Sequence, residues 1–253
     1  MENRLTKITR SQHVLITGGS RGIGRAIVMA FVDAGYVASF IYNESEQEAS
    51  ELVAWGKEKT ISIIPFKYDI ADVDGMEKLI DDITKTTGPI DILVNNAGIK
   101  VSTEFLTSTP NNWDKTMSIN LRSVYFMSQV VARRMTDGGK IINIASQAGV
   151  GHVQKSIEYG ISKAGMIYMT KSMAKVLAPK KITVNALSPG RTYTDMTHLA
   201  INKVKEQEVL KDIPLKKINS PEEVASVVLF LASAAADNIT GQSLAIDGGE
   251  CIA

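Results

Sequence analysis

The chain has 253 residues, 44% of them hydrophobic and 22% charged, which is the composition of an ordinary soluble globular protein with enough length to bury a sizeable core. Its 28 basic and 27 acidic residues leave a net charge of +1, so neither nucleic acid nor another polyanion is expected as a partner. The one cysteine, Cys251, excludes an intrachain disulfide and the polar first residues lack an apolar signal core, so we expect a cytoplasmic protein with no membrane partner.

Short apolar runs rich in β-branched residues alternate along the chain with longer helical stretches. The runs predicted to be strands cover residues 13–18, 36–42, 61–70, 90–98, 140–146, 181–190 and 242–249. Strands that are apolar on both faces and separated by helices are typical of a parallel sheet covered on both sides. No linker or repeat interrupts the pattern, so we predict an α/β protein with a single domain over residues 1–253.

Two expected helices have clear boundary signals. The helix predicted over residues 21–35 ends at Gly35. Another begins after Ser220, where Pro221 occupies the first helical position and Glu223 completes a capping box.

A glycine-rich turn, TGGSRGIG, joins the first predicted strand to the first helix. Gly18, Gly22 and Gly24 let the backbone approach a pyrophosphate, and the helix N-terminus offers free N–H groups to it. Such a turn is often only a tight connection, and its spacing is not the commonest dinucleotide-binding pattern. Its place after the first strand of an alternating α/β chain nevertheless favours a nucleotide site.

The end of the second strand decides which dinucleotide is expected. An acidic residue there would bind the ribose 2′-hydroxyl of NAD, but the position falls at Tyr42 and Asn43. Arg21 in the glycine turn could pair with a 2′-phosphate, although it could also be a solvated surface residue. We therefore expect NADP(H), with NAD(H) as the alternative if Glu44 turns in to the ribose.

A tyrosine and a lysine, Tyr159 and Lys163, stand four residues apart in YGISK and so share one helix face. Together with TGGSRGIG, NNAG at 95–98, Asn120, Ser146 and Pro189-Gly190, they form an ordered set over nearly the whole chain. In this set the chain resembles the short-chain dehydrogenase/reductase family, most closely its 3-oxoacyl-[acyl-carrier-protein] reductase branch. The resemblance implies a Rossmann-type three-layer sandwich with seven parallel strands, usually assembled as a homotetramer.

The resemblance also assigns catalytic roles to four residues. Tyr159 would exchange the proton with the substrate oxygen, while Lys163 would favour the phenolate and bind the nicotinamide ribose. Ser146 would hydrogen-bond the substrate oxygen, and Asn120 would hold a water that relays protons from Lys163. Each residue taken alone could be structural: a packed tyrosine, a solvated lysine, a strand-ending cap or a helix-interior amide.

Further residues are expected to contact the cofactor because they match the family by position. The full cofactor set is Gly18, Ser20, Arg21, Gly22, Ile23, Gly24, Tyr42, Asn43, Asp69, Ile70, Asn96, Ala97, Gly98, Tyr159, Lys163, Pro189, Gly190, Thr192 and Thr194. Asp69 could instead be a turn or cap residue. No metal site is expected, because the three histidines are dispersed along the chain.

The substrate is expected to be a ketone or secondary alcohol, with a 3-oxoacyl thioester as the leading case. A polar, lysine-rich stretch at about 193–217 is expected to form a lid over it. Arg133 and Arg134 could guide an acidic carrier protein, or could simply be exposed helix charges. His152, Lys155 and Glu158 depart from the carrier-protein pattern and leave two alternatives open: an NAD-dependent sugar, polyol or secondary-metabolite dehydrogenase, and a non-catalytic nucleotide-binding subunit.

Overall fold

Seven parallel strands form one sheet in the order β3-β2-β1-β4-β5-β6-β7 in the computed structural model, which describes residues 11–59, 61–102, 104–151, 156–198 and 203–252. The strands are β1 (His13–Thr17), β2 (Val37–Tyr42), β3 (Ile63–Lys67), β4 (Ile92–Asn95), β5 (Lys140–Ile144), β6 (Thr183–Pro189) and β7 (Ser243–Ile246). Each lies within a range predicted from the sequence. The seven-stranded parallel sheet and the Rossmann-type fold class are therefore confirmed.

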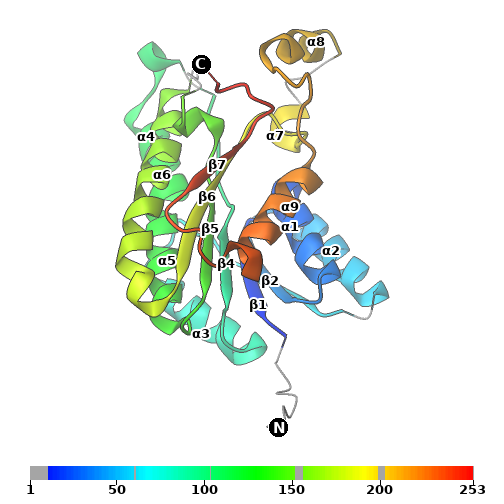
Figure 1. Ribbon diagram of the computed structural model, residues 1–253, viewed down its shortest axis with the longest axis vertical. Helices are drawn as coiled ribbons and strands as arrows, with labels where there is room; N and C mark the ends of the chain where they lie inside the picture. Colours follow the sequence, from blue (N-terminus) through cyan, green and yellow to red (C-terminus); the bar gives the residue numbers. More distant parts are fainter. Residues whose placement is uncertain (1–10, 60, 103, 152–155, 199–202, 253) are drawn as a thin grey trace.

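Helices cover the sheet on both faces (Figure 1). One layer consists of α1 (Gly22–Asp33), α2 (Glu46–Glu58) and α9 (Pro221–Ala232), and the other of α3 (Met76–Thr87), α4 (Pro110–Met117), α5 (Ser123–Arg134) and α6 (Ile157–Leu177). Each layer has its own apolar core against the sheet, with Phe31 and Phe40 in the first and Ile80 and Ile83 in the second. Strands buried on both faces explain their continuous apolar sequence.

The strand order places a crevice at the carboxyl end of β1. This strand pairs with β2 on one side and with β4 on the other, so the connections leave it in opposite directions. Open α/β sheets bind ligands at such a switch point. The glycine turn follows β1 and residues 96–98 follow β4, so the fold brings both predicted cofactor segments to this crevice.

The predicted capping box at the start of α9 is present. Ser220 Oγ accepts a hydrogen bond from the Glu223 backbone N–H, and the Glu223 carboxylate accepts one from the Ser220 N–H. Two short helices, α7 (Asp195–His198) and α8 (Lys203–Asp212), occupy the stretch predicted as a lid, at the end of the molecule away from the N-terminus (Figure 1).

Helix α4 runs into α5 through a π-helical segment, Ser118–Arg122, which the sequence periodicity did not predict. Short π segments inside helices occur frequently at functional sites. Across the described residues, no helix combines the length and the apolar character that crossing a membrane requires.

Candidate active site

The glycine turn is held against the end of β4. Gly18 has φ +66°, and a Cβ on it would come within 2.9 Å of the Ala97 Cα. A Cβ on Gly24 would lie 2.0 Å from the Gly18 carbonyl oxygen, a distance that no side chain tolerates. Asn96 ties the two segments together, because its Nδ2 donates to the carbonyls of Thr17 and Gly18 at 3.0 Å each. The predicted residues thus form a cradle from which side chains are excluded.

The loop after β6 completes this cradle. Thr194 Cγ2 lies 3.4 Å from the position that a Cβ on Gly22 would take, so residues 192–194 face the glycine turn. Thr192 Oγ1 donates to the Gly190 carbonyl, and the Thr197 hydroxyl bonds the backbone of Thr192 and Thr194. The cofactor residues predicted on both sides of the crevice are therefore brought together.

The residues expected to decide between NADP and NAD lie at positions from which their side chains could contact the ribose of a bound dinucleotide. Arg21 is the exposed N-cap of α1, and Tyr42 ends β2 with the exposed Asn43 and Glu44 after it. Within the described part of the chain, no side-chain hydrogen bond or ion pair fixes Arg21 or Glu44. Their side chains are therefore sterically accessible to a ligand.

Asp69 and Ile70, which are predicted to contact the cofactor, also hold structural positions in the turn after β3. The Asp69 carboxylate accepts from the Ala71 N–H at 2.9 Å, and its backbone carbonyl accepts from Asp72. Ile70 is buried in the core beneath α3 and α5. Asp69 therefore acts as a turn residue, which is the alternative left open from the sequence. Ile70 can offer a ligand only its backbone.

Three of the predicted catalytic residues meet at the start of α6. Ser146, at the end of β5, lies close enough to the half-buried Tyr159 for its hydroxyl to lower the pKa of the tyrosine. Lys163, one helical turn further along α6, places its Nζ 5.8 Å from the Tyr159 ring centroid. The same Nζ donates to the Ile144 carbonyl at 2.8 Å. The i,i+4 spacing in the sequence thus becomes a shared active-site face.

Burial dominates the electrostatics of this pair. It raises the pKa of the Tyr159 hydroxyl, and the nearby Ser146 hydroxyl only partly opposes the rise. Burial also lowers the pKa of Lys163 to about 8. The expectation that Lys163 brings the tyrosine pKa down does not hold in this structure, because desolvation of the phenolate is the larger effect. Tyr159 is therefore held in its protonated form at neutral pH.

Asn120 joins the site through the π-helical segment. Its side chain is fully buried, accepts from the Ile99 N–H and donates to the Ile99 carbonyl, both at 2.8 Å, and also donates to Ser162 Oγ. A Cβ on Gly98 would lie 3.2 Å from Asn120 Oδ1 and 3.5 Å from Lys163 Nζ. Asn120 therefore fixes the strand β4 loop next to Lys163.

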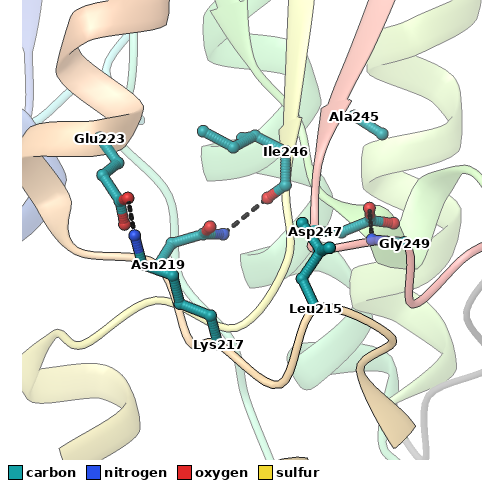
Figure 2. Close-up of a pocket in the computed structure, with 9 residues that line it drawn as sticks. Leu215, Lys217, Asn219, Glu223, Ala245, Ile246, Asp247 and Gly249 are labelled. Atoms are coloured by element: carbon teal, nitrogen blue, oxygen red, sulfur yellow. Dashed lines mark hydrogen bonds and ion pairs between the residues drawn. The ribbon is translucent and has the colours of Figure 1, made fainter.

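A cavity of about 370 Å³ lies beside the carboxyl end of β7 (Figure 2). Its walls include Lys217, Asn219, Glu223 and Asp247, and none of the four predicted catalytic residues lines it. Asn219 Nδ2 donates to the Ile246 carbonyl and Asp247 accepts from the Gly249 N–H, so these contacts fix the last residues of the chain.

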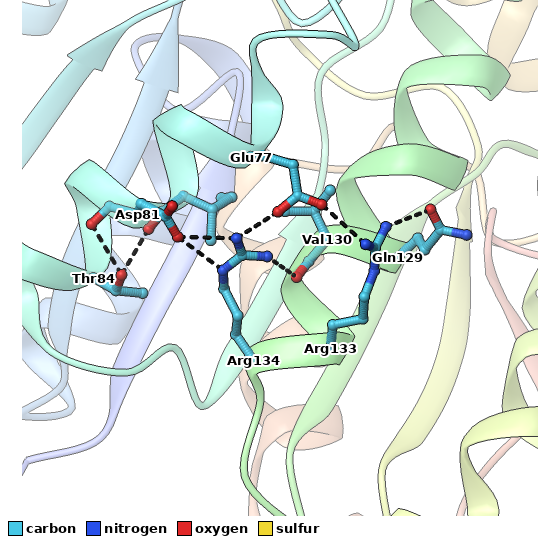
Figure 3. A network of polar contacts seen from close by, with 8 residues as sticks. Glu77, Asp81, Thr84, Gln129, Val130, Arg133 and Arg134 are labelled. Atoms are coloured by element: carbon cyan, nitrogen blue, oxygen red, sulfur yellow. Dashed lines mark hydrogen bonds and ion pairs between the residues drawn. The ribbon is translucent and has the colours of Figure 1, made fainter.

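Arg133 and Arg134, considered as guides for a carrier protein, are committed to intramolecular ion pairs (Figure 3). Arg134 binds Glu77 and Asp81 on α3, and Arg133 lies 3.1 Å from Glu77. These contacts clamp α3 to α5. The interpretation of both arginines as charges on the helix surface therefore fits better than a role in guiding a carrier protein.

Comparison with known proteins agrees with this geometry. The family described as enoyl-(acyl carrier protein) reductase matches residues 18–250. The 3-oxoacyl-[acyl-carrier-protein] reductase FabG of Staphylococcus aureus (strain Mu50) is 36% identical over 245 residues, covering 96% of this chain and 98% of that protein. The acetoacetyl-CoA reductase of Rhizobium meliloti (strain 1021) is 37% identical over 249 residues, covering 96% and 100%.

A solved structure extends the comparison to three dimensions. A short chain dehydrogenase from Burkholderia cenocepacia in complex with NADP superposes with a TM-score of 0.89 at 32% identity, over 94% of this chain and 97% of the other. The chain belongs to the short-chain dehydrogenase/reductase family. The family resemblance stated from the sequence is therefore confirmed, and the protein is an oxidoreductase.

The sequence reasoning missed four polar residues that follow or contact predicted site segments of this short-chain dehydrogenase/reductase. Lys100 Nζ lies 5.7 Å from the Tyr159 ring centroid. Gln147 Nε2 and Arg191 Nε both donate to the carboxylate of Glu250, at 3.0 and 3.3 Å. Gln147 and Arg191 directly follow predicted site residues, and Lys100 lies two positions after Gly98. Their positions in the sequence could therefore have indicated that they lie near the site. Nothing in the sequence indicates that Glu250, next to the C-terminus, folds back to them.

Proposed function

We propose that this protein is an NADP(H)-dependent reductase of 3-oxoacyl thioesters. The observation that carries the proposal is the placement of the buried Lys163, its Nζ 5.8 Å from the Tyr159 ring centroid, next to Asn120 and the glycine turn. The FabG and acetoacetyl-CoA reductase relatives support this substrate class because they match over nearly their full lengths.

The residues suit ketone reduction. A bound nicotinamide supplies the hydride to the carbonyl carbon. Ser146 holds the carbonyl oxygen and stabilises the negative charge that develops on it. Tyr159, whose raised pKa keeps its proton at neutral pH, donates that proton to the oxygen. Lys163, with Asn120 next to it, stays close enough to oppose the charge left on the phenolate.

The cradle fits a dinucleotide because three glycines remove the side chains that a pyrophosphate would displace. Gly18, Gly22 and Gly24 would face the phosphates, and Arg21 would pair with a 2′-phosphate. We expect the remaining predicted cofactor residues from Ser20 to Thr194 to line the same crevice, with the buried Ile70 contributing through its backbone. NAD(H) stays the alternative through Glu44.

Assembly and compartment complete the proposal. We expect a cytoplasmic homotetramer, as the family resemblance implies, and the α7–α8 segment as its substrate lid. Exposed apolar side chains on α4, α5 and α6 support association: Trp113, Tyr125, Ile161, Tyr168 and Val176.

A substrate panel followed by NADPH consumption tests the function. It should contain acetoacetyl-CoA, its α,β-unsaturated counterpart crotonyl-CoA, methyl acetoacetate, a ketose sugar and a cyclic ketone. We expect acetoacetyl-CoA to be reduced with the highest kcat/KM. Preference for crotonyl-CoA would instead favour the enoyl reduction named by the matching family description. Tighter binding of NADH than of NADPH would overturn the cofactor assignment.

A further inference from the structure

A buried carboxylate connects two loops at the carboxyl edge of the sheet. Glu250 follows β7, and its side chain is only 2% exposed. Gln147 Nε2, in the loop after β5, donates to one oxygen of this carboxylate at 3.0 Å. Arg191 Nε, in the loop after β6, donates to the other oxygen at 3.3 Å. One side chain therefore joins segments that follow three neighbouring strands of the sheet.

The loop after β5 carries Ser146 in a tight turn. Ser146 precedes the short 3₁₀ helix η3 (Gln147–Gly149), and its Oγ accepts a hydrogen bond from the Ala148 N–H at 3.2 Å. The Ser146 carbonyl accepts another from the Gly149 N–H at 2.9 Å. Gln147 directly follows Ser146 in this turn, so a contact that holds the Gln147 side chain also restrains the serine.

The other side of this turn packs against α6, the helix that carries Tyr159 and Lys163. A Cβ on Gly149 would lie 2.6 Å from the carbonyl carbon of Lys163, so η3 touches the helix backbone without a gap. The turn is therefore held between α6 on one side and Glu250 on the other. Loss of the Glu250 contact would leave the turn free to shift relative to Tyr159.

The same carboxylate restrains the loop after β6. Arg191 directly follows Pro189 and Gly190, which are expected to lie beside the nicotinamide. A Cβ on Gly190 would lie 2.7 Å from Gln147 Oε1, so the loops after β5 and β6 touch at this glycine. Glu250 thus fixes the serine predicted to hold the substrate oxygen together with the loop predicted to border the hydride source.

We propose that Glu250 is a positioning residue for hydride transfer, acting through Gln147 on Ser146 and through Arg191 on the loop after β6. The inference rests on the proposed ketone reduction and adds a residue to its machinery. A carboxylate suits this place because it can accept a hydrogen bond on each of its two oxygens. A misplacement of about 1 Å can slow a reaction by on the order of 10²-fold, so small shifts of these loops matter.

Glu250→Ala removes both contacts and tests the proposal. The rate of hydride transfer is measured in single turnovers with acetoacetyl-CoA, following the oxidation of NADPH by stopped-flow absorbance. We expect this rate to fall roughly tenfold or more. NADPH deuterated at both C4 positions should slow the reaction further in the wild type and in the variant, which identifies the measured step as hydride transfer.

Gln147→Leu tests the route through the turn, and remains available should Glu250→Ala fail to fold. It keeps the size of the side chain but removes the amide, so the single-turnover rate should fall here as well. In the double variant the combined loss should be smaller than the product of the two single losses, because both substitutions break the same contact.

Asp237→Ala is the matched control. Asp237 binds the buried ammonium of Lys140 at 2.6 Å, at the start of β5 and so at the opposite end of that strand from Ser146. Like Glu250→Ala, it removes a carboxylate from a basic side chain. It should lower the free energy of unfolding and leave the rate of hydride transfer unchanged.

The outcomes separate this inference from the proposed function. If Glu250→Ala or Gln147→Leu unfolds more easily but transfers hydride at the wild-type rate, Glu250 only stabilises the fold, and the inference is overturned while the ketone reductase stands. Losses that multiply in the double variant also overturn it, since Glu250 would then not act through Gln147. A wild-type enzyme that reduces no ketone would overturn both.

Discussion

At the scale of single residues, the proposed proton transfer depends on the hydroxyl of Tyr159. We expect Tyr159→Phe to lower kcat by roughly 10²- to 10⁴-fold, the usual contribution of a positioned general acid. The ring keeps its packing, so the Kd for NADPH should remain unchanged, as fluorescence titration would show. Activity near that of the wild type would rule out proton donation by this residue.

Burial of the Lys163 ammonium lowers the free energy of unfolding by a measurable amount. Its pKa is about 8 in the folded protein against an ordinary value of 10.5, so between these values the unfolded chain binds more protons. The wild-type free energy of unfolding should therefore rise, relative to that of Lys163→Met, as the pH increases from about 8 to 10.5. The rise is up to about 3 kcal/mol.

Urea denaturation at several pH values measures this difference. Lys85→Met is the control, because the Lys85 side chain is 77% exposed and its ammonium is hydrated in both states. A flat difference between wild type and Lys163→Met across this pH range would contradict the buried position of the ammonium.

At the scale of elements, the glycine turn between β1 and α1 is the least tolerant segment. Gly24→Ala would place a Cβ 2.0 Å from the Gly18 carbonyl oxygen, so the turn must open. We expect NADPH affinity to fall at least tenfold, about 1.4 kcal/mol, while the far-ultraviolet circular dichroism persists. Gly151→Ala is the control, because none of the described residues comes within 4 Å of its added Cβ. Unchanged NADPH affinity in Gly24→Ala would remove the turn from the cofactor site.

The elements also show what the sequence can and cannot reveal. The central strands β1, β2, β4, β5 and β6 were predictable because burial on both faces favours apolar residues along most of their length. The π-helical segment was not, since inserting one residue into a helix leaves hardly any trace in a 3.6-residue period. The pKa of Tyr159 was predicted in the wrong direction, because spacing reports a neighbouring charge but not the depth of burial.

The Glu250 contacts escaped prediction for a different reason. Gln147 and Glu250 are 103 positions apart, and only the folding of β5 and β7 into one sheet brings them together. Periodicity and local motifs describe neighbours in the chain, so they locate the ends of strands but not the side chains that meet above them. The four residues predicted to be catalytic could be named because each lies in or next to a recognisable motif.

At the scale of the whole molecule, the unequal surfaces of the two helical layers lead to a test of assembly. Tyr125 on α5 and Tyr168 on α6 are 47% and 74% exposed, and monomeric proteins rarely leave such aromatic area in water. If α4, α5 and α6 pack against a second copy, the combined Tyr125→Glu and Tyr168→Glu substitutions bury charge in the interface. Light scattering should then show a tetramer for the wild type and a smaller species for the variant.

The matched control adds the same charge elsewhere. Ser50→Glu with Thr86→Glu places two carboxylates on exposed positions of α2 and α3, so the tetramer should persist. A tetramer that survives in the tyrosine variant would move the interface away from these helices, and a monomeric wild type would contradict assembly itself. The four residues predicted to be catalytic lie on one chain, so a smaller species that keeps its activity would further show that assembly does not complete the site.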